Sequence, residues 1–264
     1  NLTAGLMGRG VVPVIGIRKG AVMEIVELPN GLGSKLRAVE GLVVGEDWSG
    51  TGVERFGTTS TRFEHCRFER MRVKQFTAGG AGRFAEFVDC SFDRSHLSFS
   101  PAGRTRFVRC SFRRARLVDF RVNPVDLIDC DFTGADVRRS IFWGGLDDYK
   151  RRREPDLRVR NDIRGNDFSG ATLVDTSFRR GVDLTLQRLP AGEDYALALD
   201  GAAALDRVRA LVDTWDRENR REALGRVEIW RSDLDDGQEH LFVCRPKMKD
   251  LAGWPAIRRA IING

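Results

Sequence analysis

The sequence predicts a mainly β protein whose chain winds into stacked square coils and ends in a helical segment. Three observations predict this architecture. Of the 16 Phe residues, all but one lie between Phe56 and Phe178. Large apolar residues recur at every fifth position in that region, and the whole pattern repeats at every twentieth position.

The five-residue step excludes both regular elements. From Phe87 to Phe142, every fifth residue is apolar. In a helix, which rotates by about 100° per residue, such residues drift around the axis and form no stripe. In a straight strand they alternate between opposite faces, because five is an odd number. The chain must therefore turn at each quintet, and four sides close a coil with its large apolar side chains inside.

The twenty-residue period supports the same geometry. Cys and Phe recur in register, at Cys90, Cys110 and Cys130 and at Phe92, Phe112 and Phe132. Coils stacked about 4.8 Å apart pair their backbones from one coil to the next, as neighbouring strands do. We predict that these six residues lie in the core together with their equivalents Phe87, Leu97, Phe107, Leu117, Leu127, Phe142, Phe168, Leu173 and Phe178.

The chain divides into three regions. Residues 1–40 contain short apolar runs separated by Gly and Pro, and we expect a strand-rich N-terminal cap. Residues 41–188 form the coils, with an extruded loop at 143–162 where the register breaks. Residues 189–264 lose the five-residue step and show helical spacing, which predicts a mostly helical C-terminal cap. Such a cap is needed because an open coil exposes apolar interior and unpaired strand edges.

The quintets themselves resemble those of a known family. Residues 130–134, 135–139, 166–170 and 171–175 read CDFTG, ADVRR, NDFSG and ATLVD. A small residue, then Asp or Asn, then Leu or Phe, then two polar residues is the pattern of the pentapeptide-repeat family. The resemblance implies a right-handed quadrilateral parallel β-helix, in agreement with the square coils inferred from the spacing.

The resemblance also implies a function. The best-understood members of this family are antibiotic self-resistance or quinolone-resistance proteins that engage DNA gyrase or topoisomerase IV. They are homodimers with a strongly acidic rod that resembles DNA, and in some of them an extruded loop is important. This chain instead has a net charge of +6, and its segment 85–144 is nearly neutral.

We expect no catalytic residue, no cofactor and no metal site. Cys66 extends the column of cysteines, which we interpret as buried small side chains and not as a metal or redox site. His65, His96 and His240 lack the spacing of a zinc site or of a nucleophile–base pair. An odd number of cysteines, five, argues against a disulfide framework and favours a reducing, cytoplasmic location.

Two charged clusters have competing interpretations. The acidic cluster Asp126, Asp129, Asp131 and Asp136 can bind a cation, but Asp at these positions is also what the repeat prefers for its turns. The basic segment is the candidate partner-binding site: on an extruded loop it can grip phosphate or an acidic protein surface, and a solvated linker explains it equally well. Its residues are Lys150, Arg151, Arg152, Arg153, Arg158 and Arg160.

Three functional hypotheses remain open. The first is a binding protein for a type II topoisomerase, with antibiotic self-resistance as its role. The second is a scaffold or interaction module, not an enzyme, with another protein partner. The third is a small-molecule binder or catalyst that uses a pocket between the coils and the C-terminal region, lined by Trp143, Tyr149, Trp215 or Trp230. Direct contact with nucleic acid is compatible with the basic segment, and no apolar stretch is long enough for a membrane-spanning helix.

Overall fold

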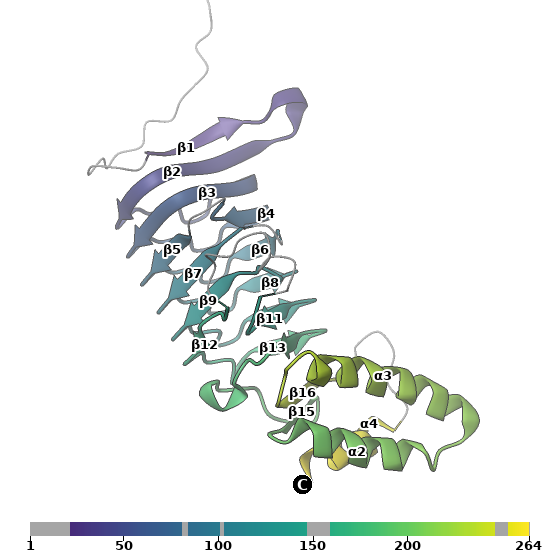
Figure 1. Cartoon of the computed structure of the whole chain (residues 1–264). Helices are drawn as coiled ribbons and strands as arrows, with labels where there is room; N and C mark the ends of the chain where they lie inside the picture. Colours follow the sequence, from purple (N-terminus) through teal and green to yellow (C-terminus); the bar gives the residue numbers. More distant parts are fainter. Residues whose placement is uncertain (1–21, 81–83, 101–102, 147–158, 246–252, 264) are drawn as a thin grey trace, which may run out of the picture.

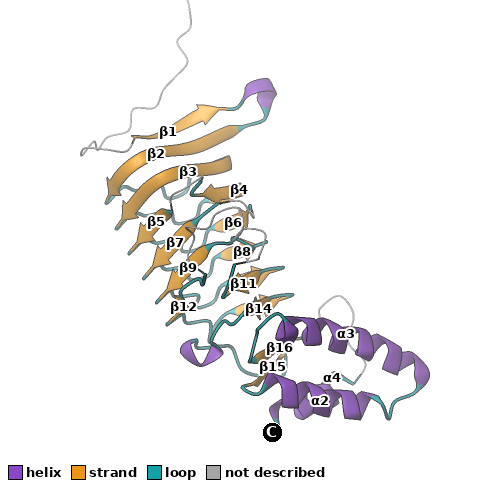
Figure 2. Ribbon diagram, in the orientation of Figure 1, coloured by secondary structure: helices purple, strands orange, loops and turns teal. Residues whose placement is uncertain are grey.

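The computed structural model describes residues 22–80, 84–100, 103–146, 159–245 and 253–263. Stacked strands form a rod, and the helices of the C-terminal region lie at the end reached by the last coils (Figure 1). Apart from the short 3-10 turns η1 (Pro29–Gly31) and η2 (Leu184–Leu186), the rod itself consists of strands and loops (Figure 2). The predicted parallel β-helix is confirmed, with about five turns.

The strands run parallel from coil to coil. One ladder contains β2 (Ser34–Val44), β3 (Gly52–Glu64), β5 (Ala85–Val88), β7 (Thr105–Val108), β9 (Val125–Ile128) and β12 (Ile163–Arg164). A second contains β4 (Arg72–Ala78), β6 (His96–Phe99), β8 (Arg116–Val118), β10 (Asp136–Arg138) and β13 (Thr172–Val174). A third side has the pair β11 (Ile141–Trp143) and β14 (Ser177–Arg179), and the fourth has single bridges such as Ser91 with Ser111.

The register locates the break in the repeat. Phe107 pairs with Leu127 at the regular spacing of twenty residues. The next partner of Leu127 is Ile163, so sixteen further residues are inserted into that coil. Gly145 and Arg160 form an antiparallel bridge, which closes the base of the inserted segment. The insertion therefore leaves the rod between these two residues.

Residues with left-handed backbone conformation make the corners. The residue before each cysteine of the column has a positive φ, for example 52° at Asp89 and 53° at Asp129, and Gly165 takes the same place in the next coil. This conformation costs a residue other than Gly about 1–2 kcal/mol. Hydrogen bonds between coils hold it, because the N–H of Asp89 donates to the carbonyl of Val108 (3.0 Å). The corners are thus fixed by the stacking of coils as well as by local preference.

Phenylalanine rings stack along the interior from coil to coil. In the longest regular column, successive ring centroids are 4.4 to 5.0 Å apart along Phe68, Phe92, Phe112, Phe132 and Phe168. Each such contact contributes about 0.5–1.5 kcal/mol beyond the burial of apolar area. Every core residue predicted from the five-residue step is buried. The interior is therefore a continuous apolar column.

At the N-terminal end, β1 (Val22–Glu27) pairs antiparallel with β2. The parallel pairing of β2 with β3 begins at Lys35 with Arg55, so strand stacking includes residues of the segment predicted as an N-terminal cap. The earlier part of that predicted cap, residues 1–21, lies outside the described residues.

The C-terminal region covers the last coil. Its elements are β15 (Tyr195–Ala198), α2 (Gly201–Val212), α3 (Arg217–Asp235), β16 (Leu241–Cys244) and α4 (Trp254–Ile262). They share an apolar core of their own, and Phe242 extends the stack of rings beyond the rod, 5.7 Å from Phe178. Where the structure describes the chain, no helix has the length and apolar character needed to cross a bilayer.

Side chains of this region bond directly to the backbone of the final coil. The Gln238 side-chain oxygen accepts hydrogen bonds from the N–H groups of Gly181 and Val182, at 3.1 and 3.0 Å. His240 Nδ1 accepts one from the N–H of Leu184 at 3.0 Å. These backbone N–H groups, which could otherwise pair with a strand of another molecule, therefore have acceptors within the chain.

We predict that Phe112→Ala lowers the free energy of unfolding by about 3–5 kcal/mol, because it opens a cavity between two stacked rings in the middle of the column. Urea titration followed by circular dichroism measures this loss. Phe84→Ala is the control, since Phe84 is half-buried and lies outside the column, and its loss should be smaller. Equal losses for the two variants would contradict the column as the main source of stability.

Candidate functional site

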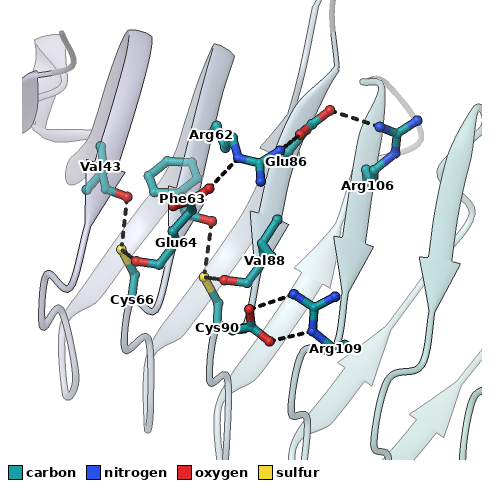
Figure 3. Close-up of polar contacts among 11 residues, drawn as sticks. Val43, Arg62, Phe63, Glu64, Cys66, Glu86, Val88, Cys90, Arg106 and Arg109 are labelled. Atoms are coloured by element: carbon teal, nitrogen blue, oxygen red, sulfur yellow. Dashed lines mark hydrogen bonds and ion pairs between the residues drawn. The ribbon is translucent and has the colours of Figure 1, made fainter.

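Arginine and carboxylate side chains alternate along the outside of the rod (Figure 3). Glu86 accepts hydrogen bonds from Arg62 of the preceding coil (2.6 Å) and from Arg106 of the following coil (3.0 Å). Arg106 also donates to the buried carboxylate of Asp126 at 2.9 Å. This face is therefore a column of alternating, mutually neutralised charges and not a continuous acidic surface.

Three of the four aspartates of the acidic cluster noted in the sequence are engaged in the same way, and the fourth, Asp129, interacts electrostatically with Arg109. Asp126 bonds Arg106, Asp131 accepts from Arg113 at 2.6 Å, and Asp136 accepts from Arg138 at 2.8 Å. In the described ranges, no group of three or more His, Cys, Asp or Glu side chains is placed to hold a metal ion.

The cysteine column faces the interior. Cys66 and Cys90 each donate from Sγ to two backbone carbonyls, at 3.4 and 3.6 Å (Figure 3). Burial raises the pKa of the Cys110 thiol well above its usual value, and burial raises that of Cys244 to about 12. These thiols therefore remain protonated at neutral pH and are poor nucleophiles. His65 and His96 are exposed on the outside of the coils.

Of the six predicted partner-binding residues, Arg160 belongs to the described part of the chain. Arg160 is exposed at the base of the inserted loop. It lies beside Gly181, because a Cβ added to Gly181 would be 3.5 Å from the guanidinium group of Arg160. Nearby, the guanidinium groups of Arg179 and Arg180 lie 5.9 and 5.1 Å from the ring centroid of Trp143. We call Trp143, Arg160 and Arg180 the loop-base surface. The other predicted residues, Lys150, Arg151, Arg152, Arg153 and Arg158, lie outside the described residues.

A cleft of about 570 Å³ separates the last coils from α3. The C-terminal half of α3 lies beside the rod, whereas its N-terminal half projects away from it (Figure 1). Strands β11 and β14 form one wall, and the opposite wall carries Ile229 and Trp230 of α3. Of the four aromatic residues proposed for such a pocket, Trp230 lines this cleft. Trp215 lines a separate hollow, and Tyr149 is not among the described residues.

The charged groups of the cleft are mostly arginines. Five Arg and two Asp residues line it: Arg121, Arg138, Arg139, Arg179, Arg226, Asp175 and Asp233. Arg179 forms an ion pair with Asp233 at 3.1 Å. Burial nevertheless raises the pKa of Asp233 above its usual value, because removal of the carboxylate from water outweighs the attraction of Arg179. The surroundings of Asp233 are thus partly shielded from water, and polar contacts are stronger in such surroundings.

Most of these cleft residues escaped the sequence analysis. Arg121 and Arg226 are 105 positions apart and belong to different elements, so no motif or spacing connects them. The local signal in the sequence that points to this face of α3 is an apolar residue, Ile229, within a strongly polar helix; its exposure is known only from the structure.

We predict that none of the five thiols reacts with Ellman's reagent at mildly alkaline pH while the protein is folded. All five should react after unfolding in guanidinium chloride, since burial and protonation then no longer protect them. Absorbance of the released thiolate measures the reaction. Rapid labelling of any column cysteine in the folded protein would contradict its placement in the interior.

The exposed ion pairs should make the free energy of unfolding depend on pH in the acid range. Hydrogen bonds from Arg109 and Arg139 lower the pKa of Asp89 and Asp119, respectively. Their contribution is therefore present above about pH 4 and is lost as the pH falls through the lowered folded-state pKa values. The double variant Asp89→Asn/Asp119→Asn should lose about 1 kcal/mol or less per pair at neutral pH.

That difference from the unmodified chain should disappear in strong acid, as measured by urea unfolding at a series of pH values. Asn keeps the left-handed backbone that both positions require. Asp175→Asn is the control, because Asp175 has the same backbone conformation but, in the part of the chain described, only a longer-range electrostatic interaction with Arg139 and no ion pair, so its loss should be smaller. A constant difference at all pH values would show that the ion pairs are not its origin.

Comparison with known families agrees with the coils described above. Residues 105–144, which run from β7 through β11, match the family model for pentapeptide repeats with eight copies. No match was found among curated proteins. The parallel pairing continues from the matched coils to β5 on one side and to β13 and β14 on the other. The match and the parallel pairing together show that this chain contains pentapeptide repeats wound into a parallel β-helix.

Proposed function

We propose that this pentapeptide-repeat protein is a non-enzymatic binding protein that contacts a protein partner through the loop-base surface. The observation that carries the proposal is the grouping of Trp143, Arg160 and Arg180 where the inserted loop leaves the rod. Trp and Arg are the residue types that most often dominate binding energy at protein interfaces. The sequence between Gly145 and Arg160 has five Lys and Arg against four Asp and Glu, but four of its cations are consecutive at 150–153, and such a run favours an acidic partner.

A type II topoisomerase is the first partner to consider, on the strength of the family resemblance. The alternating charges around Glu86 do not reproduce the acidic face of a DNA mimic, so we propose contact through the loop-base surface instead. Homodimerisation through the C-terminal helices, direct contact of the basic segment with nucleic acid, and a cytoplasmic location stay predictions. A role in antibiotic self-resistance follows only if the topoisomerase is the partner.

The test is a DNA gyrase supercoiling assay, repeated with topoisomerase IV decatenation, in the presence and absence of a quinolone. We expect the protein to change supercoiling or to reduce quinolone-induced cleavage, and Arg160→Glu to raise the concentration needed by roughly tenfold or more. Arg94→Glu makes the same charge change at an exposed corner elsewhere on the rod and should leave the effect unchanged. No effect on either enzyme would eliminate a topoisomerase as the partner.

The scaffold hypothesis has its own test. Host lysate is passed over the immobilised protein and over both variants, and the retained proteins are compared. A protein held by the unmodified chain and by Arg94→Glu, but released by Arg160→Glu, would identify another partner of the loop-base surface. Identical retention by all three would overturn the proposed binding surface.

A further inference from the structure

We propose that the cleft between the last coils and α3 binds a small amphipathic anion, a carboxylate or phosphate monoester attached to an apolar body. This inference goes beyond the protein-binding function and does not depend on it, since the loop-base residues Trp143, Arg160 and Arg180 do not line the cleft.

Arg226 is the first argument for an anion. It is half-buried on α3, lines the cleft, and its guanidinium group has no hydrogen bond or ion pair to any described residue. Withdrawing a charged group from water is unfavourable unless an opposite charge or hydrogen-bond acceptors replace the solvent. Arg121 on the facing wall donates from Nε to the carbonyl of Arg139 at 3.0 Å, and it interacts electrostatically with Asp119, whose carboxylate is already bound by Arg139. The guanidinium fork is well suited to bind carboxylate and phosphate oxygens.

The remaining charges of the cleft limit the ligand to one anionic group. Arg138, Arg139 and Arg179 are paired with Asp136, Asp119 and Asp233. Asp175 is exposed and interacts electrostatically with Arg139. Within the described chain, Arg121 and Arg226 are therefore the two lining arginines that form no ion pair or hydrogen bond with a carboxylate. A polyanion would meet Asp175 and Asp233, whereas a ligand with a single anionic group can bind Arg226, with Arg121 lining the same cleft.

The apolar residues that line the cleft indicate that the rest of the ligand, beyond its anionic group, is apolar. Ile229 is 48 % exposed although it faces a hollow, and Trp230, Ile141 and Val174 line the same space. The volume of about 570 Å³ lies within the range of about 300–1,000 Å³ typical of small-molecule sites. Burying these side chains against an apolar body would be favourable at roughly 25 cal/mol per Å². The cleft thus combines arginines that form no ion pair with apolar side chains on both of its walls.

The experiment is titration calorimetry of the full chain with decanoate, decyl phosphate and decanol, which share an apolar body and differ in the head group. We expect decanoate or decyl phosphate to bind more tightly than decanol, and the stronger of the two identifies the acid class. Arg226→Gln should weaken the anion by roughly tenfold or more and leave decanol unchanged. Arg226→Lys should retain part of the preference, because it keeps the charge but loses the fork.

Arg221→Gln is the matched control, because it makes the same change at an exposed position of the same helix outside the cleft. It should bind like the unmodified chain, and thermal unfolding verifies that both variants fold. Equal affinities for decanoate, decyl phosphate and decanol, or equal losses in Arg221→Gln and Arg226→Gln, would overturn the proposal. Binding of a glutamate-rich peptide without binding of either small anion would also overturn it, since the cleft would then serve a protein segment.

Discussion

The structure depends on the stacking of one coil on the next at the spacing of hydrogen-bonded strands. At this spacing, residues in equivalent positions touch, so each choice of side chain in one coil constrains the coils above and below it. Phe112 illustrates the constraint, because its ring lies 5.0 Å from both Phe92 and Phe132. The same stacking supplies the backbone hydrogen bonds that hold Asp89 in its left-handed corner conformation.

The outer surface follows from the same spacing. An arginine on one coil reaches a carboxylate one coil away, as Arg109 reaches Asp89 with two hydrogen bonds of 2.7 Å. Arginine is therefore used in large numbers without creating a uniformly basic rod. The net charge of +6 consequently says little about the charge of any one face, and Glu86 between two arginines shows why. Unpaired guanidinium groups become the informative ones, and Arg226 is one of them.

The end of the rod explains how a cleft arises in a solenoid with a filled interior. The last coil needs partners for its backbone donors and a cover for its rings, which Gln238, His240 and Phe242 provide. These residues belong to a region with a separate apolar core, so α3 meets the rod only over its C-terminal half. The space beside that contact is lined by Arg226 and Ile229 and forms the cleft. The cap and the candidate ligand site are thus consequences of one junction.

The sequence by itself determined the coils. A five-residue step repeated over many coils is incompatible with a helix or a straight strand, so the period alone implied corners, an inward Phe and Cys column, and a cap at 189–264. Only the tertiary structure decided which arginines remain unpaired and where α3 lies. Arg121 belongs to the rod and Arg226, 105 positions later, to the helical region; both line one cleft, and no local pattern encodes that arrangement. The geometry of a coil can be predicted from the sequence because the same pattern repeats in every coil. The junction between the coils and the helical region cannot, because it depends on packing between segments that are far apart in the sequence.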